Sequence, residues 1–272
     1  MSSLKELLAK KLTTAERDKL RTAQDLIGDI AIIDVPRVLI KKQKIIASAV
    51  RAINPFIKVV AKKVGAHSGK HRTQKLIILA GEKRYVTVHK EWGLTFHLDV
   101  HTCYFSPRTG TERMRIARLV KTNERVLVMF SGIGPYCLVI GKHSAAGEVV
   151  GVELNPSAHK YAIKNRAANK LAHISFYKGS VSKVVPGLGL FDRVVMPLPK
   201  TSTRYLQTAL AVAKKGTMLH VYVFAKEKQF ASKAQAVLQQ CARFKKCKLI
   251  QITRTAQTKP REYRICVDIL VQ

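Results

Sequence analysis

Acidic residues are scarce in this sequence: 17 Asp and Glu stand against 49 Lys and Arg, which gives a formal net charge of +32. Residues 1–50 hold ten of the basic and six of the acidic residues, and the remaining 39 basic and 11 acidic residues follow. A detachable basic tail is therefore excluded as the source of the excess. So large a charge repels itself unless a polyanion gathers on it, and nucleic acid is the usual polyanion. The charge predicts a nucleic-acid partner, with solvated surface lysines or an anionic membrane surface as the alternatives.

The sequence also contains few cysteines and no long apolar runs. The five cysteines are an odd number without a CxxC pair, so neither a disulfide framework nor a structural zinc site is indicated and we expect no metal. No apolar run reaches the roughly 18 residues of a membrane span, and the start MSSLKELLAKKL is too highly charged for a signal peptide. We expect a cytoplasmic monomer that does not associate with membranes.

Two patterns of hydrophobic residues divide the chain. Up to about residue 100, helical spacing over 4–27 and 38–53 alternates with short strand patterns and a hairpin at Trp92-Gly93, which predicts a mixed α/β module with an antiparallel sheet. From residue 111 onward, strands and helices alternate at the spacing of βαβ units, which predicts a Rossmann-like doubly wound sheet. We place the domains at 1–115 and 116–272.

Candidate ligand-binding residues follow the expected parallel strands, since doubly wound sheets bind ligands at the carboxyl ends of their strands. The first strand of the second half runs into MFSGIGPY (129–136), and the second ends at Glu153, where a carboxylate can bind ribose hydroxyls. The loop contains one Gly-x-Gly spacing but not the third glycine of the dinucleotide-binding motif. This favours S-adenosylmethionine over NAD, because S-adenosylmethionine has no pyrophosphate to be bound. The predicted cofactor contacts are Phe130, Ser131, Gly132, Gly134, Glu153, Leu154, Asn155 and Ser180.

A third motif, FDRVVMPLPK (191–200), ends the expected fourth strand. Its two prolines stiffen the backbone around Leu198 and are expected to leave nearby carbonyls without local partners, free to bind a nucleobase. A plain strand-terminating turn would explain the prolines equally well.

Taken in order, YFSPRTGTERMRIARLV (104–120), MFSGIGPY, VELNP (152–156) and DRVVMPLPK resemble the archaeal and eukaryotic tRNA guanine-37 N1-methyltransferase family. That family also includes the aminocarboxypropyltransferases of wyosine biosynthesis and archaeal methyltransferases of the wyosine precursor. The resemblance covers about residues 28–225. It implies S-adenosylmethionine-dependent modification of the purine at position 37, in the anticodon-loop region of tRNA. The family's small N-terminal RNA-docking domain is expected to be absent.

The resemblance also implies roles for individual residues. Glu112 resembles the general base that takes the N1 proton of guanine, and Arg72, in GKHRTQK, resembles the arginine that positions the base. Pro197 stands at the base-facing position. The expected RNA contacts are Arg108, Arg115, Pro199 and Lys200. Glu112 could instead form an ion pair on its own helix with Arg115 or Arg108, and Arg72 could be one more phosphate contact.

Three departures from the family pattern leave alternatives open. The family usually has Asp where this chain has Val128 and Ser180, and Asn where it has Pro197. MPLP in place of MNLP points to the archaeal branch that methylates carbon 7 of the wyosine precursor. Transfer of the aminocarboxypropyl group is a second possibility. A third is a tRNA-binding paralogue without catalytic activity.

Overall fold

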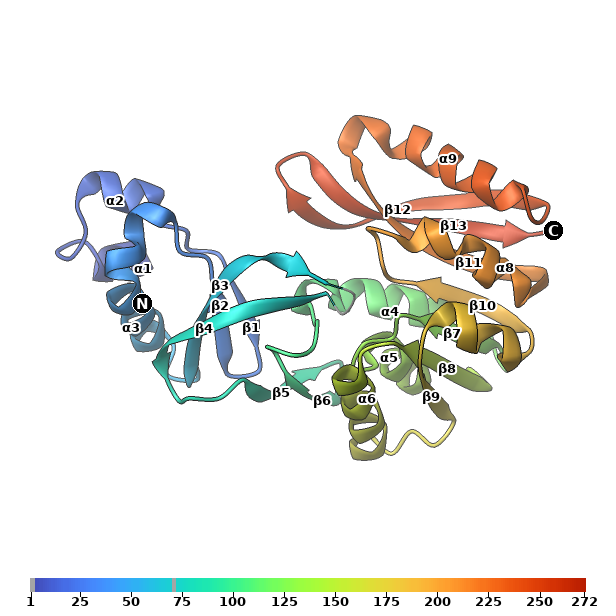
Figure 1. The fold of residues 1–272 in the computed structure, drawn as a ribbon, viewed down its shortest axis with the longest axis horizontal. Coiled ribbons are helices and arrows are strands. Elements are labelled where there is room, and N and C mark those ends of the chain that lie inside the picture. Colours follow the sequence, from blue (N-terminus) through green and yellow to red (C-terminus); the bar gives the residue numbers. More distant parts are fainter. Residues whose placement is uncertain (1–2, 70–71) are drawn as a thin grey trace. The chain divides into compact units, whose positions relative to one another are not determined.

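A computed structural model of the chain describes residues 3–69 and 72–272, and it divides into two compact units, Met1–Pro107 and Arg108–Gln272 (Figure 1). The division precedes the boundary predicted at residues 115 and 116. Helix α4 (Gly110–Leu119) packs against α5 (Pro135–His143), so it belongs to the second unit. Among the described residues, no helix has the length and apolar character needed to cross a bilayer.

The first unit contains a four-stranded sheet in the order β1-β2-β3-β4 and a separate two-stranded sheet, β5-β6. Its elements are α1 (Leu4–Leu7), α2 (Thr14–Lys19), β1 (Gln24–Ile27), β2 (Ile30–Ile33), η1 (Arg37–Lys42), α3 (Gln43–Ile53), β3 (Val59–Ser68), β4 (Thr73–Gly81), β5 (Val86–Glu91) and β6 (Leu94–Asp99). The outer pairs of the larger sheet are antiparallel, as expected, whereas β2 and β3 are parallel because η1 and α3 connect them.

Local sequence explains the main elements of this unit. The apolar face of α3 buries Ile46, Ala47 and Val50 in the same cluster as buried strand residues. The hairpin between β5 and β6 turns at Trp92 and Gly93, whose φ angles are 51° and 68°, the positive values that a two-residue type I′ turn requires. The helical spacing predicted up to residue 27 is wrong at its end, because residues 24–27 pair with β2 as strand β1.

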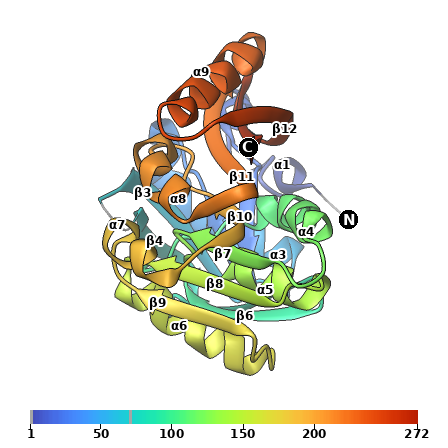
Figure 2. The same cartoon turned by 90° about the vertical axis from the view of Figure 1, so that its right-hand side faces the viewer.

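The second unit contains a seven-stranded sheet in the order β12-β13-β11-β10-β7-β8-β9 (Figure 2). The remaining elements are η2 (Pro107–Thr109), β7 (Arg125–Met129), β8 (Glu148–Glu153), α6 (Pro156–Ala168), β9 (Ile174–Lys178), α7 (Val181–Val184), η3 (Val185–Leu188), β10 (Phe191–Met196), η4 (Ser202–Tyr205), α8 (Leu206–Ala211), β11 (Ala213–Lys226), η5 (Glu227–Gln229), α9 (Phe230–Ala242), β12 (Cys247–Lys259) and β13 (Glu262–Val271). The five strands from β11 to β9 are parallel, which confirms the Rossmann-like sheet.

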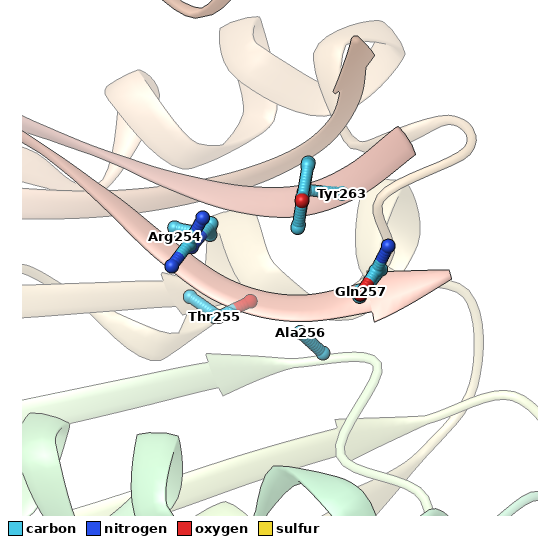
Figure 3. Close-up of a pocket in the computed structure, with 5 residues that line it drawn as sticks. All are labelled: Arg254, Thr255, Ala256, Gln257 and Tyr263. Carbon is cyan, nitrogen blue, oxygen red and sulfur yellow. The ribbon is translucent and has the colours of Figure 1, made fainter. Parts of the chain in front are cut away.

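Strands β12 and β13 form a long antiparallel hairpin that extends the parallel sheet beyond β11. A shallow hollow of about 240 Å³ lies on it, lined by Arg254, Thr255, Ala256, Gln257 and Tyr263 (Figure 3). The Arg254 guanidinium stands 5.1 Å from the centre of the Tyr263 ring and pairs with Glu227 at 3.6 Å. Since Glu227 balances this charge, we assign the hollow no ligand.

Candidate active site

The loops that carry the predicted motifs meet at one edge of the sheet. Met129 on β7 pairs with Val152 on β8, and Glu153 on β8 pairs with Lys178 on β9. Val195 on β10 pairs with Val128 on β7. Parallel strands in register end at the same level, so the loops after β7, β8, β9 and β10 share the carboxyl edge. The strand order reverses between β7 and β10, the place where such sheets bind ligands.

Glu153 binds the glycine-rich loop directly. Its Oε2 accepts a hydrogen bond from the backbone N–H of Gly132 at 2.7 Å, and its Oε1 accepts one from the N–H of Asn155 at 2.7 Å. The Asn155 side chain in turn caps α6, which begins at Pro156. The carboxylate predicted to bind ribose is thus held in place by the backbone of two of the four loops.

The glycine-rich loop has an unusual backbone. Phe130, Gly132 and Gly134 have φ angles of 59°, 58° and 89°, and a phenylalanine with positive φ is a strained conformation that often occurs at functional sites. A Cβ on Gly134 would come within 2.5 Å of the Leu138 side chain. At this position, packing against the following helix therefore excludes a side chain.

The remaining predicted cofactor contacts lie around Glu153. The Ser131 Oγ is buried and has no hydrogen-bond partner among the described residues. Leu154 is exposed, and Ser180 begins α7 directly after Gly179, whose N–H donates to the backbone carbonyl of Glu153. A carboxylate and a buried hydroxyl without a partner among the described residues fit a ligand that carries hydroxyl and amino groups.

The loop after β10 is more ordered than predicted. The carbonyl of Leu198 accepts hydrogen bonds from Thr201 and Ser202, and that of Met196 accepts one from Leu198. The expectation that the prolines leave these carbonyls unpaired is wrong, because the chain turns directly into η4. Pro197 and Pro199 are half-buried and Lys200 is exposed in this loop.

Glu112 is buried in the second unit, with 4% of its surface exposed. Arg115, one turn along α4, donates to both of its carboxylate oxygens at 2.8 Å. The Tyr222 hydroxyl on β11 donates to Oε1 at 2.5 Å. The ion pair with Arg115 that was considered as an alternative is therefore present. Its two hydrogen bonds fix the plane of the buried carboxylate.

The Glu112 carboxylate lies near the carboxyl edge of the sheet. In the pairing of β10 with β11, Met196 faces Val221, so Tyr222 stands one residue beyond the end of β10. The backbone carbonyl of Tyr222 accepts a hydrogen bond from the Ser202 hydroxyl, and the Tyr136 ring, directly after the glycine-rich loop, packs edge-on against the Tyr222 ring at 5.9 Å. Tyr222 thus connects Glu112 with the loops after β7 and β10.

A buried network of charges extends from Arg115 across the sheet. Arg115 also donates to Asp268 Oδ2 at 2.8 Å, and Asp268 Oδ1 accepts from His220 Nδ1 at 2.7 Å. Burial alone would raise the pKa of Asp268, but the hydrogen bonds from His220 and Arg115 outweigh it and hold that pKa well below its usual range. Arg193 continues the network by pairing with Glu124 at 2.7 Å.

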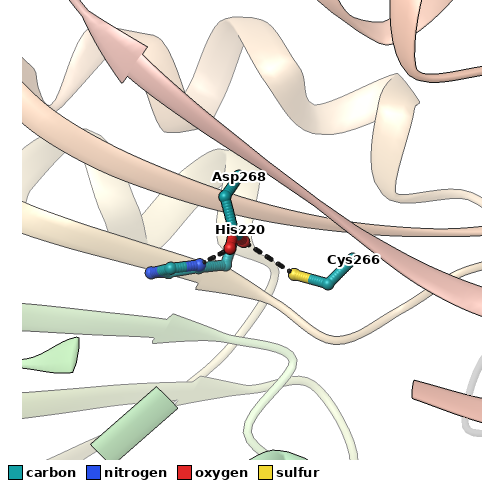
Figure 4. Close-up of side chains that lie close together, drawn as sticks. All are labelled: His220, Cys266 and Asp268. Carbon is teal, nitrogen blue, oxygen red and sulfur yellow. Dashed lines mark hydrogen bonds and ion pairs between the residues drawn. The ribbon is translucent and has the colours of Figure 1, made fainter. Parts of the chain in front are cut away.

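His220, Cys266 and Asp268 form a cluster whose ligand atoms lie within 4.8 Å of one another (Figure 4). Arg193 can only donate, so the His220 Nε2 at 2.7 Å is the acceptor and Nδ1 carries the proton that binds Asp268. The Cys266 thiol also donates to Asp268, at 3.1 Å. Both ring nitrogens of His220 are therefore engaged, and the cluster is a hydrogen-bonded core rather than a preformed metal site.

His220 makes the stability of the chain depend on pH. Burial lowers the pKa of His220 from 6.5, so the unfolded chain binds a proton that the folded chain does not. The free energy of unfolding is expected to fall as the pH drops below 6.5, with a slope of up to about 1.4 kcal/mol per pH unit from this residue. Urea unfolding of the wild type and of His220→Gln between about pH 7 and 5 measures it.

The matched control for that experiment is His143→Gln, because His143 is exposed. The slope should become shallower in His220→Gln and stay unchanged in His143→Gln. Equal slopes in all three proteins would show that His220 is not held neutral.

Two predicted site residues come from other segments of the chain. Arg72 belongs to the first unit, in the turn between β3 and β4, where its φ is 54°; its motif neighbours at 70 and 71 lie outside the described residues. Arg108 is exposed in η2, directly before α4. Arg115 was predicted to contact RNA, but within the described residues its side chain donates hydrogen bonds to Glu112 and Asp268.

Sequence reasoning missed Tyr222, Asp268 and Arg193. Tyr222 and Asp268 lie on different strands, 46 residues apart, and β13 was not predicted at all. A usable signal was present, since YRICVDILV (263–271) places an aspartate inside an apolar strand pattern, where an unpaired charge would be costly.

Comparisons with known proteins agree with this geometry. Residues 87–250 match the family model of the TRM5/TYW2 methyltransferase domain, and residues 4–84 match the TYW2 N-terminal domain. The chain is 33% identical over 261 residues to the tRNA (guanine(37)-N(1))-methyltransferase Trm5b of Pyrococcus abyssi, with 93% of this chain and 76% of the relative covered. It is 30% identical over 297 residues to the tRNA (guanine(37)-N(1))/4-demethylwyosine(37)-methyltransferase Taw22 of Nanoarchaeum equitans, with 90% and 98% covered.

A solved complex of aTrm5 and tRNALeu has the same fold. It aligns with a TM-score of 0.87 and 28% identity, over 100% of this chain and 78% of that one. The match to the methyltransferase domain spans more than half of the chain. It includes the sequence motifs from which the fold was predicted. This chain therefore belongs to the TRM5/TYW2 methyltransferase family.

Proposed function

We propose that this chain transfers the methyl group of S-adenosylmethionine to the purine at position 37 of tRNA, at N1 of guanosine, at carbon 7 of the wyosine precursor, or at both. One observation carries the proposal. The buried Glu112 carboxylate is joined through Tyr222 to Tyr136, which follows the glycine-rich loop, near the sheet edge where the Glu153 carboxylate is also held. Relatives named for methyl transfer to position 37 support the same chemistry.

The loops at the sheet edge would hold the cofactor. The Glu153 carboxylate, which the two backbone N–H groups hold, can accept hydrogen bonds from ribose hydroxyls, and the buried Ser131 hydroxyl offers a further hydrogen bond. When bound, S-adenosylmethionine supplies a methyl carbon activated by a sulfonium. The chain's own residues position that group and keep water out.

Glu112 would act on the substrate. Guanine N1 is a weak acid, and its proton must leave for N1 to become a nucleophile. The N1–H bond breaks, the proton moves to the Glu112 carboxylate, and the electron pair remains on N1. Pro197 would face the base, and it has neither a side-chain amide nor an N–H with which to read a guanine edge. This feature favours the wyosine precursor as one of the substrates.

The tRNA would bind through the excess of basic residues after residue 50. We place Arg72, Arg108, Pro199 and Lys200 among the RNA contacts. Arg115 would instead support Glu112. An enzyme of this kind works where tRNA is present, and the cytoplasm is the compartment that the proposal implies.

A direct test is incubation of the protein with S-adenosylmethionine and two RNAs, a tRNA with guanosine 37 and one with the wyosine precursor. Mass spectrometry of the nucleosides, together with analysis of the released cofactor product, separates the possibilities. Methylated nucleoside with S-adenosylhomocysteine supports the proposal. Methylthioadenosine would show aminocarboxypropyl transfer, and tRNA binding without product would show a non-catalytic paralogue.

Cofactor binding is expected to depend on Glu153. Glu153→Ala removes charge-assisted hydrogen bonds worth about 1.5–3 kcal/mol each and frees the Gly132 N–H. The affinity for S-adenosylmethionine should fall roughly ten- to a hundredfold, as measured by calorimetry.

The matched control for this change is Glu148→Ala. Glu148 lies at the opposite end of the same strand and pairs with Arg125. Its replacement should leave the affinity unchanged. Wild-type affinity in Glu153→Ala would place the ribose site elsewhere.

A further inference from the structure

We propose that Tyr222 is a positioning residue for the transfer reaction, which fixes the Glu112 carboxylate so that Oε2 is the atom that takes the substrate proton. The proposal rests on the proposed function, because it concerns how the general base is held. It is carried by the 2.5 Å hydrogen bond between two side chains that lie 110 residues apart. Tyr222 is fully buried and Glu112 is 4% exposed, so water does not replace this bond.

The two carboxylate oxygens are in different surroundings. Oε1 accepts hydrogen bonds from the Tyr222 hydroxyl and from Arg115 Nη2, whereas Oε2 accepts one from Arg115 Nε within the described part of the chain. A carboxylate oxygen can accept two hydrogen bonds, so Oε2 keeps a lone pair for a proton and Oε1 does not. Arg115 alone would give each oxygen one hydrogen-bond donor. The Tyr222 hydroxyl adds a second donor to Oε1 only.

The direction of the hydrogen bond is fixed as well. Burial raises the pKa of Tyr222 well above its ordinary value, so the phenol keeps its proton and donates at every pH at which the protein is folded. The Ser202 hydroxyl binds the Tyr222 backbone carbonyl at 2.6 Å, and the Tyr136 ring packs against the Tyr222 ring. The donor is thereby held between the loop after β10 and the helix after the glycine-rich loop.

The groups packed around Glu112 come from four elements. The charged and titratable side chains that face this carboxylate and its tyrosine are Arg113 and Arg115 on α4, Tyr136 on α5, Tyr222 on β11, and Arg264, Cys266 and Asp268 on β13. Burial raises the pKa of Tyr136 and Cys266, and the pKa of Asp268 is held low by its hydrogen bonds to His220 and Arg115. Glu112 is therefore the carboxylate of this group to which we assign the substrate proton.

The test is single-turnover methyl transfer to guanosine-37 tRNA, with the full chain and saturating S-adenosylmethionine. In Tyr222→Phe the ring and its packing stay, but Oε1 loses a donor. The two oxygens then have one donor each, and the atom that takes the proton is no longer fixed. The rate should fall about tenfold, while the affinities for cofactor and tRNA change less than about twofold.

A double variant separates positioning from a structural role. If Tyr222 acts through Glu112, then Glu112→Gln with Tyr222→Phe should react at the same rate as Glu112→Gln alone. The control is Tyr85→Phe, which removes a phenol that donates to the Leu76 carbonyl in the first unit. It should retain the wild-type rate.

The outcomes distinguish the two proposals. A wild-type protein that modifies neither RNA would overturn the proposed function and this assignment with it. An active wild type whose rate is reproduced by Tyr222→Phe would overturn the role of Tyr222 alone. So would a double variant in which the two losses multiply, or a Tyr222→Phe protein that only unfolds more easily.

Discussion

Glu112→Gln should lower the single-turnover rate of methyl transfer to N1 of guanosine 37 about a hundredfold or more, the loss expected when a positioned general base is removed. The amide keeps the shape of the side chain and can still accept hydrogen bonds from Tyr222 and Arg115. Affinities for cofactor and tRNA should therefore stay close to those of the wild type. Rapid-quench kinetics with nucleoside analysis measures the rate.

The buried network requires a matched control for this change. Glu124 carries the same charge at the other end of the network, where it pairs with Arg193. Glu124→Gln should lower the free energy of unfolding without a loss of rate. On the wyosine precursor, where the proton leaves carbon 7 after the methyl group has arrived, Glu112→Gln should slow the reaction much less. If Glu112→Gln reacts with both RNAs at the wild-type rate, Glu112 is an ion-pair residue and not the general base.

Raising the salt concentration should weaken tRNA binding about a thousandfold or more between roughly 50 and 200 mM, the effect of six or more phosphate contacts. The reason is the excess of 39 basic over 11 acidic residues after residue 50. Each lysine or arginine that neutralises a phosphate releases a counterion, so the logarithm of affinity falls linearly with that of the salt concentration. Filter binding without cofactor measures the slope.

Cofactor affinity over the same salt range is the control, because the Glu153 site binds a small ligand by short-range hydrogen bonds. It should change little. A flat salt dependence for tRNA would mean that the basic residues do not bind phosphates, and the polyanion interpretation of the charge would be wrong.

Much of the candidate site is local in the sequence and could be predicted from it. The glycine-rich turn, the acid about twenty residues later and the prolines after the fourth strand each follow a strand directly. A strand–loop–helix unit is recognisable from its period and its turn residues, and parallel strands bring their carboxyl ends to one edge whatever their order. The family resemblance, which the comparisons confirm, rests on the same local motifs.

Other features came from pairing between distant segments. The parallel contact of β2 with β3 and the hairpin of β12 with β13 depend on which strand edges meet, and period alone does not decide this. The carbonyls around Leu198 were misjudged for a similar reason, since the chain beyond Pro199 turns back to bind them.

The fold class, the positions of the loops at the sheet edge and the excess of positive charge follow from the amino-acid sequence, because each depends on residue type and short spacing. The surroundings of Glu112 come from contacts between distant segments. The ion pair with Arg115 lies within one helical turn, but the Tyr222 hydroxyl and Asp268 come from strands 110 and more residues away. Which oxygen of a buried carboxylate can take a proton depends on those donors, and three-dimensional packing alone brings them together.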